Sequence, residues 1–348
     1  MSDKADTFLP IRFGTYEEAR TWIGRKTELR TCDDEVNWQA IKYFCALVED
    51  GNPNYWNPDE ARRRYGAIIS PPGMLMVWLM PLPWRPEGKA QDAVIATMVP
   101  LPGDTLINVS TDSEYFIPMK VGDLLSVQEE VVDVTPEKNT GLGRGHFITT
   151  LATVRKQNEE LVATNRNVMF RFSAAGGAGV KPKKTASMTS VPQSASISGK
   201  KRGRLFEDVR EGETLPEVVM PVTIHLCVKD AAATHDYFPG HHDRDYAKAQ
   251  NARDSYLNTM FFHGFVDRVV TDWAGPDAWV ARRRLDMVLP VCIGDTMRTE
   301  ARVVRCREEN GQGMVEVEVR VLTEWGLGAR ATLTCRLARA NAVRSGSI

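Results

Sequence analysis

An acid and a base stand close together about two thirds of the way along the chain. Asp236 is followed by Tyr-Phe-Pro-Gly and then by His241. A carboxylate and an imidazole at such a spacing can hold one water molecule and exchange protons with it. The proline and glycine between them predict an irregular turn. The spacing alone fits a turn with a capping aspartate and an ordinary histidine equally well. The neighbouring elements are needed to distinguish this interpretation from an active site.

The residues around this turn predict an α+β domain. Residues 255–274 place apolar side chains at helical spacing, and Gly275 and Pro276 end the helix. A β-rich stretch is expected before the turn, at residues 218–228. Strand-like runs follow the helix at residues 280–291, 295–306, 314–322 and 329–337, with hairpin chemistry in Glu-Glu-Asn-Gly-Gln-Gly. One long helix with about five antiparallel strands predicts a sheet that wraps the helix.

The chain repeats itself, which indicates two copies of one fold. A shift of 186 positions aligns the two versions of the turn without a gap. The aligned pairs are Asp236 with Asp50, Pro239 with Pro53, Ala247 with Ala61 and Met260 with Met74. Further on, Pro-Met-Lys-Val-Gly-Asp at residues 118–123 aligns with Pro-Val-Cys-Ile-Gly-Asp at residues 290–295, now at a shift of 172. The first copy therefore carries a longer insertion between its helix and this strand.

The sequence of the first half predicts the same coarse order of elements as the second half. Residues 38–49 read as an amphipathic helix that leads into the Asp50 turn. Residues 71–82 are expected to be the counterpart of the central helix, and residues 115–134 and 145–172 to supply strands. Tyr55 stands where the second copy has His241, so this copy lacks the base.

Composition bounds the class of protein. The chain has 348 residues, is 43% hydrophobic and 26% charged, and has a formal net charge of −1, which is ordinary for a globular protein of two domains. Nothing global indicates nucleic acid or an acidic membrane surface as a partner. There is no apolar run of 18 residues and no signal-peptide core, and the six scattered cysteines form no Cys-x-x-Cys pair. We therefore expect a cytoplasmic protein with reduced thiols.

A low-complexity stretch separates the two copies. Residues 173–204 are rich in Gly, Ala, Ser and Lys and contain no acidic residue. Such a stretch buries too little apolar surface to order itself, so we expect a flexible basic linker. Its seven Lys and Arg are either a solvated tether or a contact for a phosphorylated ligand. The expected parts are a first half at residues 1–172, this linker, and a second half at residues 205–348.

The turn resembles the active-site motif of a known family. The MaoC-like (R)-specific enoyl-CoA hydratases carry Asp-x-Asn-Pro-x-His, five residues, then Ala or Ser. This chain has Asp236, Pro239, His241 and Ala247 at those positions, with Phe238 in place of the family's Asn. The first half resembles the family's degenerate N-terminal hotdog domain. The resemblance is closest to the paired hydratase domains of bacterial steroid side-chain degradation, which here are fused in one chain. Two stretches carry it: Val-Asn-Trp-Gln-Ala-Ile-Lys-Tyr-Phe-Cys-Ala-Leu-Val-Glu-Asp-Gly-Asn-Pro and Val-Thr-Asp-Trp-Ala-Gly-Pro.

The resemblance implies a fold and a mechanism. The fold would be a double hotdog, with two antiparallel sheets each wrapping a long central helix, packed as a pseudo-dimer. Asp236 and His241 would hold the attacking water, with Asp236 as base and later proton donor. The backbone N–H of Thr259, where the family often has Gly, would face the thioester oxygen, because amides at a helix N-terminus lack partners and carry partial positive charge. Asn258 would be a substrate-binding residue beside it.

Other residues at the turn have more than one interpretation. His235, His242 and Asp243 flank the pair and could suggest a metal cluster. Because neighbouring side chains in an extended turn point to opposite sides, we expect no metal site. His263, on the predicted central helix, fits a hydrogen-bonded core histidine better than a catalytic one.

Two groups of residues are candidates for binding the substrate. Arg282, Arg283 and Arg284 could contact the phosphates of CoA, although strand alternation would send only one or two of them to one face and a solvated strand edge fits equally well. Met74 and Trp78, in a stretch rich in Met and Trp, could line a roomy apolar pocket, although each singly is better explained as core.

The sequence therefore predicts a cofactor-independent enoyl-CoA hydratase, a hydro-lyase that converts a trans-2-enoyl-CoA to the 3-hydroxyacyl-CoA. A bulky acyl group, such as a steroid side chain, is the first expectation. The alternatives are a dehydratase acting on a smaller acyl group and a non-catalytic acyl-CoA-binding scaffold subunit, which Phe238 favours. A homodimer is expected, with an aldolase or thiolase as a possible partner.

Overall fold

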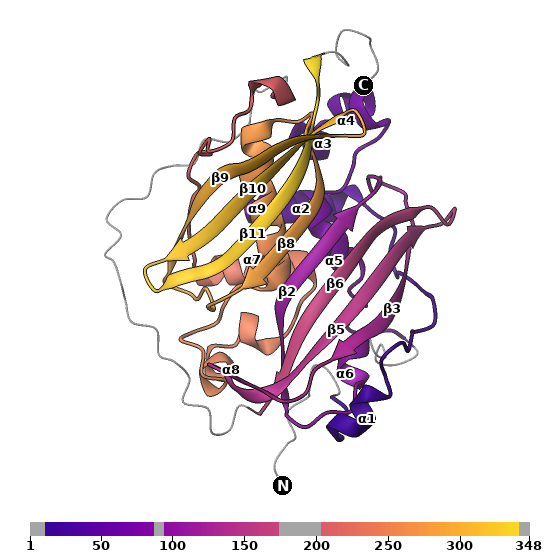
Figure 1. Cartoon of the computed structure of the whole chain (residues 1–348), viewed down its shortest axis with the longest axis vertical. Helices are drawn as coiled ribbons and strands as arrows, with labels where there is room; N and C mark the ends of the chain where they lie inside the picture. The colour runs from indigo at the N-terminus through magenta and orange to yellow at the C-terminus, as the bar shows by residue number, and fades with distance from the viewer. Residues whose placement is uncertain (1–10, 87–93, 174–202, 341–348) are drawn as a thin grey trace.

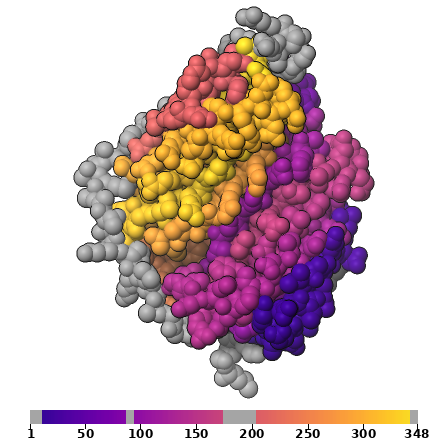
Figure 2. Space-filling view, in the orientation of Figure 1, coloured from indigo at the N-terminus to yellow at the C-terminus, as the bar shows by residue number. Residues whose placement is uncertain are grey.

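The chain forms one continuous antiparallel sheet with its helices on one face (Figure 1). The structure is a computed structural model that describes residues 11–86, 94–173 and 203–340. The expected linker lies outside these residues except at its ends. In the space-filling view, strands of the second half lie directly against strands of the first half over the exposed face of the sheet (Figure 2).

The sheet has eleven strands, in the order β1-β3-β5-β6-β2-β8-β11-β10-β9-β7, with β4 paired to β5. The first half contributes β1 Arg30–Thr31, β2 Thr105–Tyr115, β3 Leu125–Val134, β4 Lys138–Thr140, β5 Gly143–Lys156 and β6 Leu161–Phe172. The second half contributes β7 Val219–Pro221, β8 Trp279–Met287, β9 Thr296–Glu309, β10 Gln312–Thr323 and β11 Gly326–Leu337. Because β2 pairs with β8 from Ser110–Asp286 to Glu114–Arg282, the prediction of two separate sheets is wrong. The α+β class is confirmed.

The helices are short except for three. The first half has α1 Tyr16–Arg20, α2 Trp38–Val48, α3 Pro53–Trp56, α4 Pro58–Tyr65, the 3-10 turn η1 Pro72–Met74, α5 Leu75–Trp78 and α6 Ile95–Met98. The second half has η2 Phe206–Asp208, α7 Ile224–Thr234, η3 Pro239–His241, α8 Arg244–Ala249 and α9 Thr259–Ala274. The predicted central helix of the second half is α9, which starts later than expected because Asn258 caps it through the N–H of Phe261.

Two predictions about helices are wrong. Most of the β-rich stretch expected before the Asp236 turn is helix α7, and β7 is only three residues long. The expected central helix of the first half, at residues 71–82, is only the turn η1 followed by the four residues of α5. Pro71 and Pro72 account for part of this shortening, because proline donates no backbone hydrogen bond and the residue before it avoids helical geometry.

The internal repeat is visible in the backbone. At the shift of 186, α2 aligns with α7 over all 11 residues, and both end on a left-handed residue, Glu49 at φ 57° and His235 at φ 58°. At the shift of 172, Asp123 and Asp295 each accept a backbone N–H three residues earlier. The alignment of α2 with α7, which was not used to predict the repeat, supports two related halves.

Helix α9 is the centre of the molecule. Of its 16 residues 14 are buried, so it is surrounded on nearly all sides by protein. The buried polar side chains on it are paired: Asp267 accepts from Arg283 of β8 at 2.6 Å, and Arg283 also donates to the hydroxyl of Tyr115 of β2. This charge network joins the helix to both halves of the sheet.

The first half touches α9 backbone to backbone. A methyl group on Gly73 would lie 2.8 Å from the N atom and 2.9 Å from the Cα atom of Gly264. A methyl group on Gly264 would lie 2.5 Å from the ring of Phe44. Only a residue without a side chain allows η1 to approach the helix this closely.

No helix in the described residues is long and apolar enough to cross a membrane.

We predict that Gly73→Ala destabilises the protein by about 1–3 kcal/mol, because the new methyl group meets backbone that cannot move aside. The measurement is the free energy of unfolding from urea denaturation. Lys248→Ala, an exposed change on α8, is the control and should leave that free energy unchanged. Equal stability of Gly73→Ala and the native protein would contradict the close contact.

Candidate active site

The Asp236 turn lies between α7 and α8. His235 ends α7 in the left-handed conformation, which turns the chain sharply, and Asp236 follows. The carboxylate of Asp236 accepts the backbone N–H of Phe238 at 3.3 Å, and η3 then carries His241. Asp50 accepts the N–H of Asn52 in the same way in the first half, so both turns are built by the same local hydrogen bond.

The structure brings the predicted acid and base together. Nε2 of His241 lies 3.5 Å from Oδ2 of Asp236, and their side chains are 8% and 20% exposed. Nδ1 of His241 lies 2.8 Å from the carbonyl oxygen of Tyr256. Because a carbonyl only accepts, Nδ1 carries a proton and Nε2 is the atom that faces Asp236.

The two groups shift each other's pKa. Burial alone would raise the pKa of Asp236, but the charge and hydrogen bond of His241 and the N–H of Phe238 outweigh it and lower that pKa. Burial alone would lower the pKa of His241, but Asp236 and then Asp230 outweigh it and raise that pKa. Both shifts favour the same charged pair, an imidazolium beside a carboxylate.

Aromatic rings enclose the imidazole. Phe238 and Tyr256 both lie edge-on to His241, with ring centroids at 5.5 and 5.1 Å. Gly240 makes room for them, since a methyl group there would lie 2.7 Å from the Tyr256 hydroxyl and 2.8 Å from the Phe238 ring. Phe238, the departure from the family motif, thus covers the imidazole while its backbone holds Asp236.

The N-terminus of α9 is held by side chains from α7. Asn258 caps the helix at Phe261, so the amides of Thr259 and Met260 have no partner within the helix. Nδ2 of Asn258 donates to Thr234 Oγ1 at 2.6 Å, and its backbone N–H donates to Asp230 at 2.8 Å. Asn258 is therefore a positioning residue at the helix start, and its buried amide contacts protein.

Asp230 was missed by the sequence analysis. It is fully buried, and burial raises its pKa to about 7, while the charge of His241 lowers it and that of Asp236 raises it. The signal that could have found it was the repeat itself: at the shift of 186, residues 224–234 align with the amphipathic helix at 38–48. That alignment would have placed Asp230 on the buried face of a helix.

The first half keeps the acid and lacks the base. Burial and the charge of Asp272 raise the pKa of Asp50 to about 7. Tyr55 is buried, and its carbonyl oxygen accepts from Trp38 at 2.8 Å. Burial raises the pKa of its phenol, so it cannot exchange protons with Asp50 near neutral pH.

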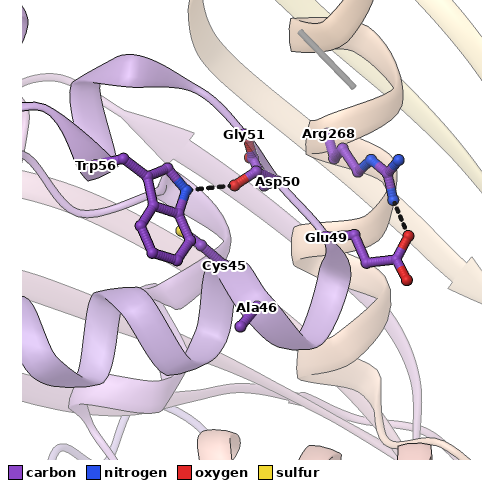
Figure 3. Close-up of a pocket in the computed structure, with 7 residues that line it drawn as sticks. All are labelled: Cys45, Ala46, Glu49, Asp50, Gly51, Trp56 and Arg268. Atoms are coloured by element: carbon purple, nitrogen blue, oxygen red, sulfur yellow. Dashed lines mark hydrogen bonds and ion pairs between the residues drawn. The ribbon is translucent and has the colours of Figure 1, made fainter. Parts of the chain in front are cut away.

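A pocket of about 280 Å³ lies beside this turn and not beside the acid/base pair (Figure 3). Glu49 and Arg268 meet on one side of it at 3.5 Å, and the indole N–H of Trp56 donates to the carbonyl of Asp50 at 2.6 Å on the other. Its full lining is Cys45, Ala46, Glu49, Asp50, Gly51, Trp56 and Arg268.

The three arginines of β8 point to two faces. Arg283 is buried with Asp267, where its guanidinium cannot reach a phosphate in solution. Arg282 and Arg284 lie on the opposite face, 57% and 61% exposed, and pair with Asp112 and Asp286. Alternation along the strand is confirmed, and it places both exposed arginines on the face away from α9.

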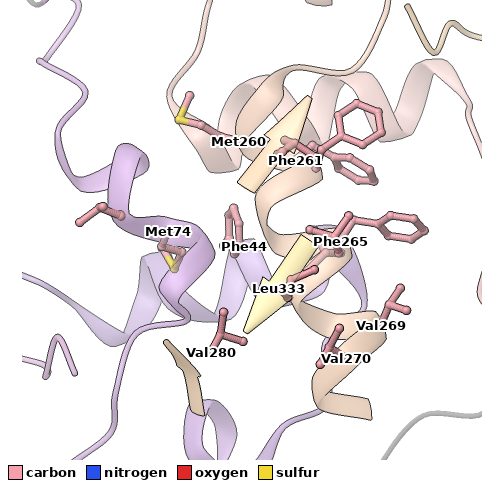
Figure 4. Packing of buried hydrophobic residues seen from close by; sticks show 14 of the residues in the cluster. Phe44, Met74, Met260, Phe261, Phe265, Val269, Val270, Val280 and Leu333 are labelled. Carbon is pink, nitrogen blue, oxygen red and sulfur yellow. The ribbon is translucent and has the colours of Figure 1, made fainter. Parts of the chain in front are cut away.

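Met74 and Trp78 lie in the hydrophobic core. Met74 is fully buried close to Phe44 and Val280 (Figure 4), and the indole N–H of Trp78 donates to Ser70 at 2.9 Å. His263 is buried against Thr111 at 2.9 Å, as expected of a core histidine. His242 is exposed and meets the Tyr237 carbonyl at 3.1 Å.

Comparisons with known proteins place each half in a related family. The family described as "MaoC like domain" matches residues 210–325, and the one described as "FAS1-like, dehydratase domain region" matches residues 21–165. The chain is 35% identical over 108 residues to the 3-oxo-4,17-pregnadiene-20-carboxyl-CoA hydratase beta subunit of Mycobacterium tuberculosis, covering 81% of that protein and 31% of this chain. The chain belongs to the MaoC-like family of hydratases and dehydratases.

A second relative is matched over only part of its length. A Thermomonospora curvata protein described as a probable enoyl-CoA hydratase alpha subunit is 36% identical over 182 residues, covering 50% of this chain and 54% of that protein. The chain thus spans about half the length of that alpha subunit.

Solved structures establish the fold. A MaoC-like dehydratase matches over 92% of this chain and 100% of its own, with a TM-score of 0.69 and 20% identity. A Mycobacterium tuberculosis protein described as having a double hotdog fold matches over 90% of this chain and 96% of its own, with a TM-score of 0.62 and 14% identity. The single sheet with its central helix is a double hotdog.

We predict that the imidazole of His241 titrates above its ordinary pKa of 6.5, as followed by NMR. The stabilisation from the pair is present between the lowered pKa of Asp236 and the raised pKa of His241 and is lost outside that window, as Asp236 gains a proton or His241 loses one. Asp236→Asn should lower the His241 pKa, because the dominant favourable charge is gone. An unchanged titration would show that the two groups are not coupled.

Proposed function

We propose that this chain is a hydratase of trans-2-enoyl-CoA thioesters, and that Asp236 and His241 are its catalytic residues. The observation that carries the proposal is the 3.5 Å contact between these two side chains next to the start of α9, in the half that matches the MaoC-like domain. One relative is described as a probable enoyl-CoA hydratase alpha subunit and another as the beta subunit of an acyl-CoA hydratase, and both descriptions support this activity.

The reaction needs a base, a proton donor and a site for negative charge. Asp236 takes a proton from a water molecule whose oxygen forms the new bond to C3 of the acyl chain. The electron pair of the C2–C3 double bond moves toward the thioester, and negative charge gathers on its oxygen. The protonated Asp236 then delivers the proton to C2, which balances the addition of one water. His241 donates a hydrogen bond through Nε2 and keeps the water in place.

The thioester oxygen meets the backbone N–H of Thr259 in this proposal. An amide at the start of a 16-residue helix is unpaired and adds the partial positive charge of the helix dipole. The side chain takes no part, which is consistent with Thr at a position where the family often has Gly. Asp230, Asn258 and Thr234 fix this helix start in space.

The two halves have different tasks in this proposal. Residues 205–348 carry the reaction, and residues 1–172, which have Tyr55 in place of a base, accommodate the acyl group. The matches to an alpha and to a beta subunit of related hydratases support a fusion of two such partners in one chain. The shortened central helix of the first half, α5 with η1, is the feature that would leave room for a bulky acyl group. The name of the beta-subunit relative makes a steroid side chain the first candidate.

The second candidate is an acyl-CoA-binding scaffold without turnover. Phe238 favours it, because this ring covers the imidazole where the family motif has a polar Asn. Purified protein that binds an enoyl-CoA without converting it would support the scaffold and exclude the hydratase.

We predict that Asp236→Asn and His241→Ala each fold but lower kcat/KM for enoyl-CoA hydration by about 10²–10⁴, the usual contribution of a general acid or base. The matched control is Asp50→Asn, the same change at the aligned position of the first half, which should keep nearly full activity. Loss of the enoyl-thioester absorbance measures the rate. If the Asp50 variant lost as much activity as the Asp236 variant, the assignment of the site to the second half would be wrong.

We also predict that kcat/KM rises with the size of the acyl group. A series from crotonyl-CoA to a steroid-side-chain enoyl-CoA, assayed with the same protein, provides the measurement. Buried apolar surface stabilises the bound substrate, so a pocket of matching size favours the larger acyl group. A preference for crotonyl-CoA would point to the smaller-substrate dehydratase.

A further inference from the structure

A third carboxyl group is hydrogen-bonded to the same segment as the acid/base pair, and the reaction described above does not use it. Asp230 accepts the backbone N–H of Asn258, two residues after Tyr256, whose carbonyl oxygen lies 2.8 Å from Nδ1 of His241. Asp230, on α7, has 0% exposure. Its Oδ2 accepts the backbone N–H of Asn258 at 2.8 Å, and its Oδ1 is buried without a hydrogen-bond partner in the described structure. A buried carboxyl with half of its hydrogen-bonding capacity unused is costly unless it serves a purpose.

Asp230 belongs to a polar cluster that only the second half has. Its main-chain oxygen accepts from Thr234 Oγ1 at 2.6 Å, and that hydroxyl accepts from Nδ2 of Asn258 at 2.6 Å. The aligned residues of the first half are Phe44, Val48 and Pro72, none of which has a polar side chain. The acid of the turn is kept in both halves as Asp236 and Asp50. The cluster therefore accompanies the histidine and is not a requirement of the fold.

The charges of the site explain what a third carboxyl would do. In the charged pair that the pKa shifts of both groups favour, the imidazolium of His241 faces the carboxylate of Asp236. When Asp236 takes a proton from water it becomes neutral, and a buried cation would be left without a counter-ion. Such a cation is strongly disfavoured in a protein interior. A second carboxylate, already ionised before the reaction begins, balances this cation, and no further proton has to leave the site.

We propose that Asp230 is a positioning residue that keeps His241 protonated while Asp236 holds the proton taken from water, and that it also seats the start of α9. This inference rests on the hydratase function proposed above. The charges of the three groups act in the sense that this role requires: His241 lowers the pKa of Asp230, and Asp236 raises it.

The other groups around the site do not compete for this role. Burial raises the pKa of Tyr256, which faces His241 from the segment before α9, so its phenol stays neutral. On α7, burial raises the pKa of Cys227 to about 12, and that of Cys292 nearby to about 11, so both thiols stay neutral. The charge of His242 lowers the pKa of Asp236, and the carboxylate of Asp254 is paired with Arg244.

The test measures the pKa of His241 by NMR in Asp230→Asn. The asparagine oxygen can still accept the Asn258 N–H, so the variant should fold, but the asparagine side chain carries no negative charge. We expect the His241 pKa to fall by about one unit, the size of a lost neighbouring charge. We expect kcat for the enoyl-CoA to fall about tenfold, the equivalent of that shift, with KM within about twofold. If this variant does not fold, Asp230→Ser takes its place.

Two controls separate charge from structure. Asp245→Asn removes an exposed charge on α8 and should leave the His241 pKa unchanged. Thr234→Val copies the first half, loosens the Asn258 link, and should lower Tm without moving the His241 pKa. An unchanged pKa in Asp230→Asn, or an equal shift in Asp245→Asn, overturns the inference. Since the titration needs no substrate, it stands apart from the hydratase assay: absence of turnover by the native protein would overturn the proposed function alone.

Discussion

The pairing of Arg283 with Asp267 and Tyr115 is the interaction on which the rest of the structure depends. Asp267 lies on the central helix, Arg283 on a strand of the second half and Tyr115 on a strand of the first half, and all three are buried. Removing one partner of a buried ion pair costs about 3–5 kcal/mol, because the other charge is left without compensation. The helix cannot turn or slide without breaking this network. The start of α9, where the thioester oxygen is proposed to lie, is therefore fixed relative to both halves of the sheet.

Much of the fold followed from patterns in the sequence. The repeat predicted two related halves, and alternation and hairpin chemistry predicted β8 to β11 closely. The joining of the two halves into one sheet could not be predicted, because the pairing of β2 with β8 depends on residues 168 to 176 positions apart. Helix α7 was mistaken for a strand because its β-branched and apolar start, Val-Thr-Ile, resembles one locally. The packing of this segment against α2, which a local pattern does not show, favours the helix.

The acid and base of the candidate site were predictable, and their surroundings were not. Asp236 and His241 lie within one turn, so local spacing was enough to bring them together. Asp230 and Tyr256 reach His241 from other elements, and only the packed structure shows that they do. Arg283 differs from what its residue type predicts. Arginine is usually exposed, but Arg283 is buried because its partner Asp267 lies on a helix that is itself enclosed.

The contact between Gly73 and Gly264 has a consequence for how such a molecule can diversify. At the shift of 186, Gly73 corresponds to Thr259 and Gly264 corresponds to Trp78, so the two glycines are not equivalent positions of the repeat. In a pair of identical subunits every substitution appears on both sides of the twofold axis at once. A tandem chain is free of that constraint: one side can give up a helix and a histidine while the other keeps both. Asymmetry is thus encoded in the gene and needs no sorting of subunits during assembly.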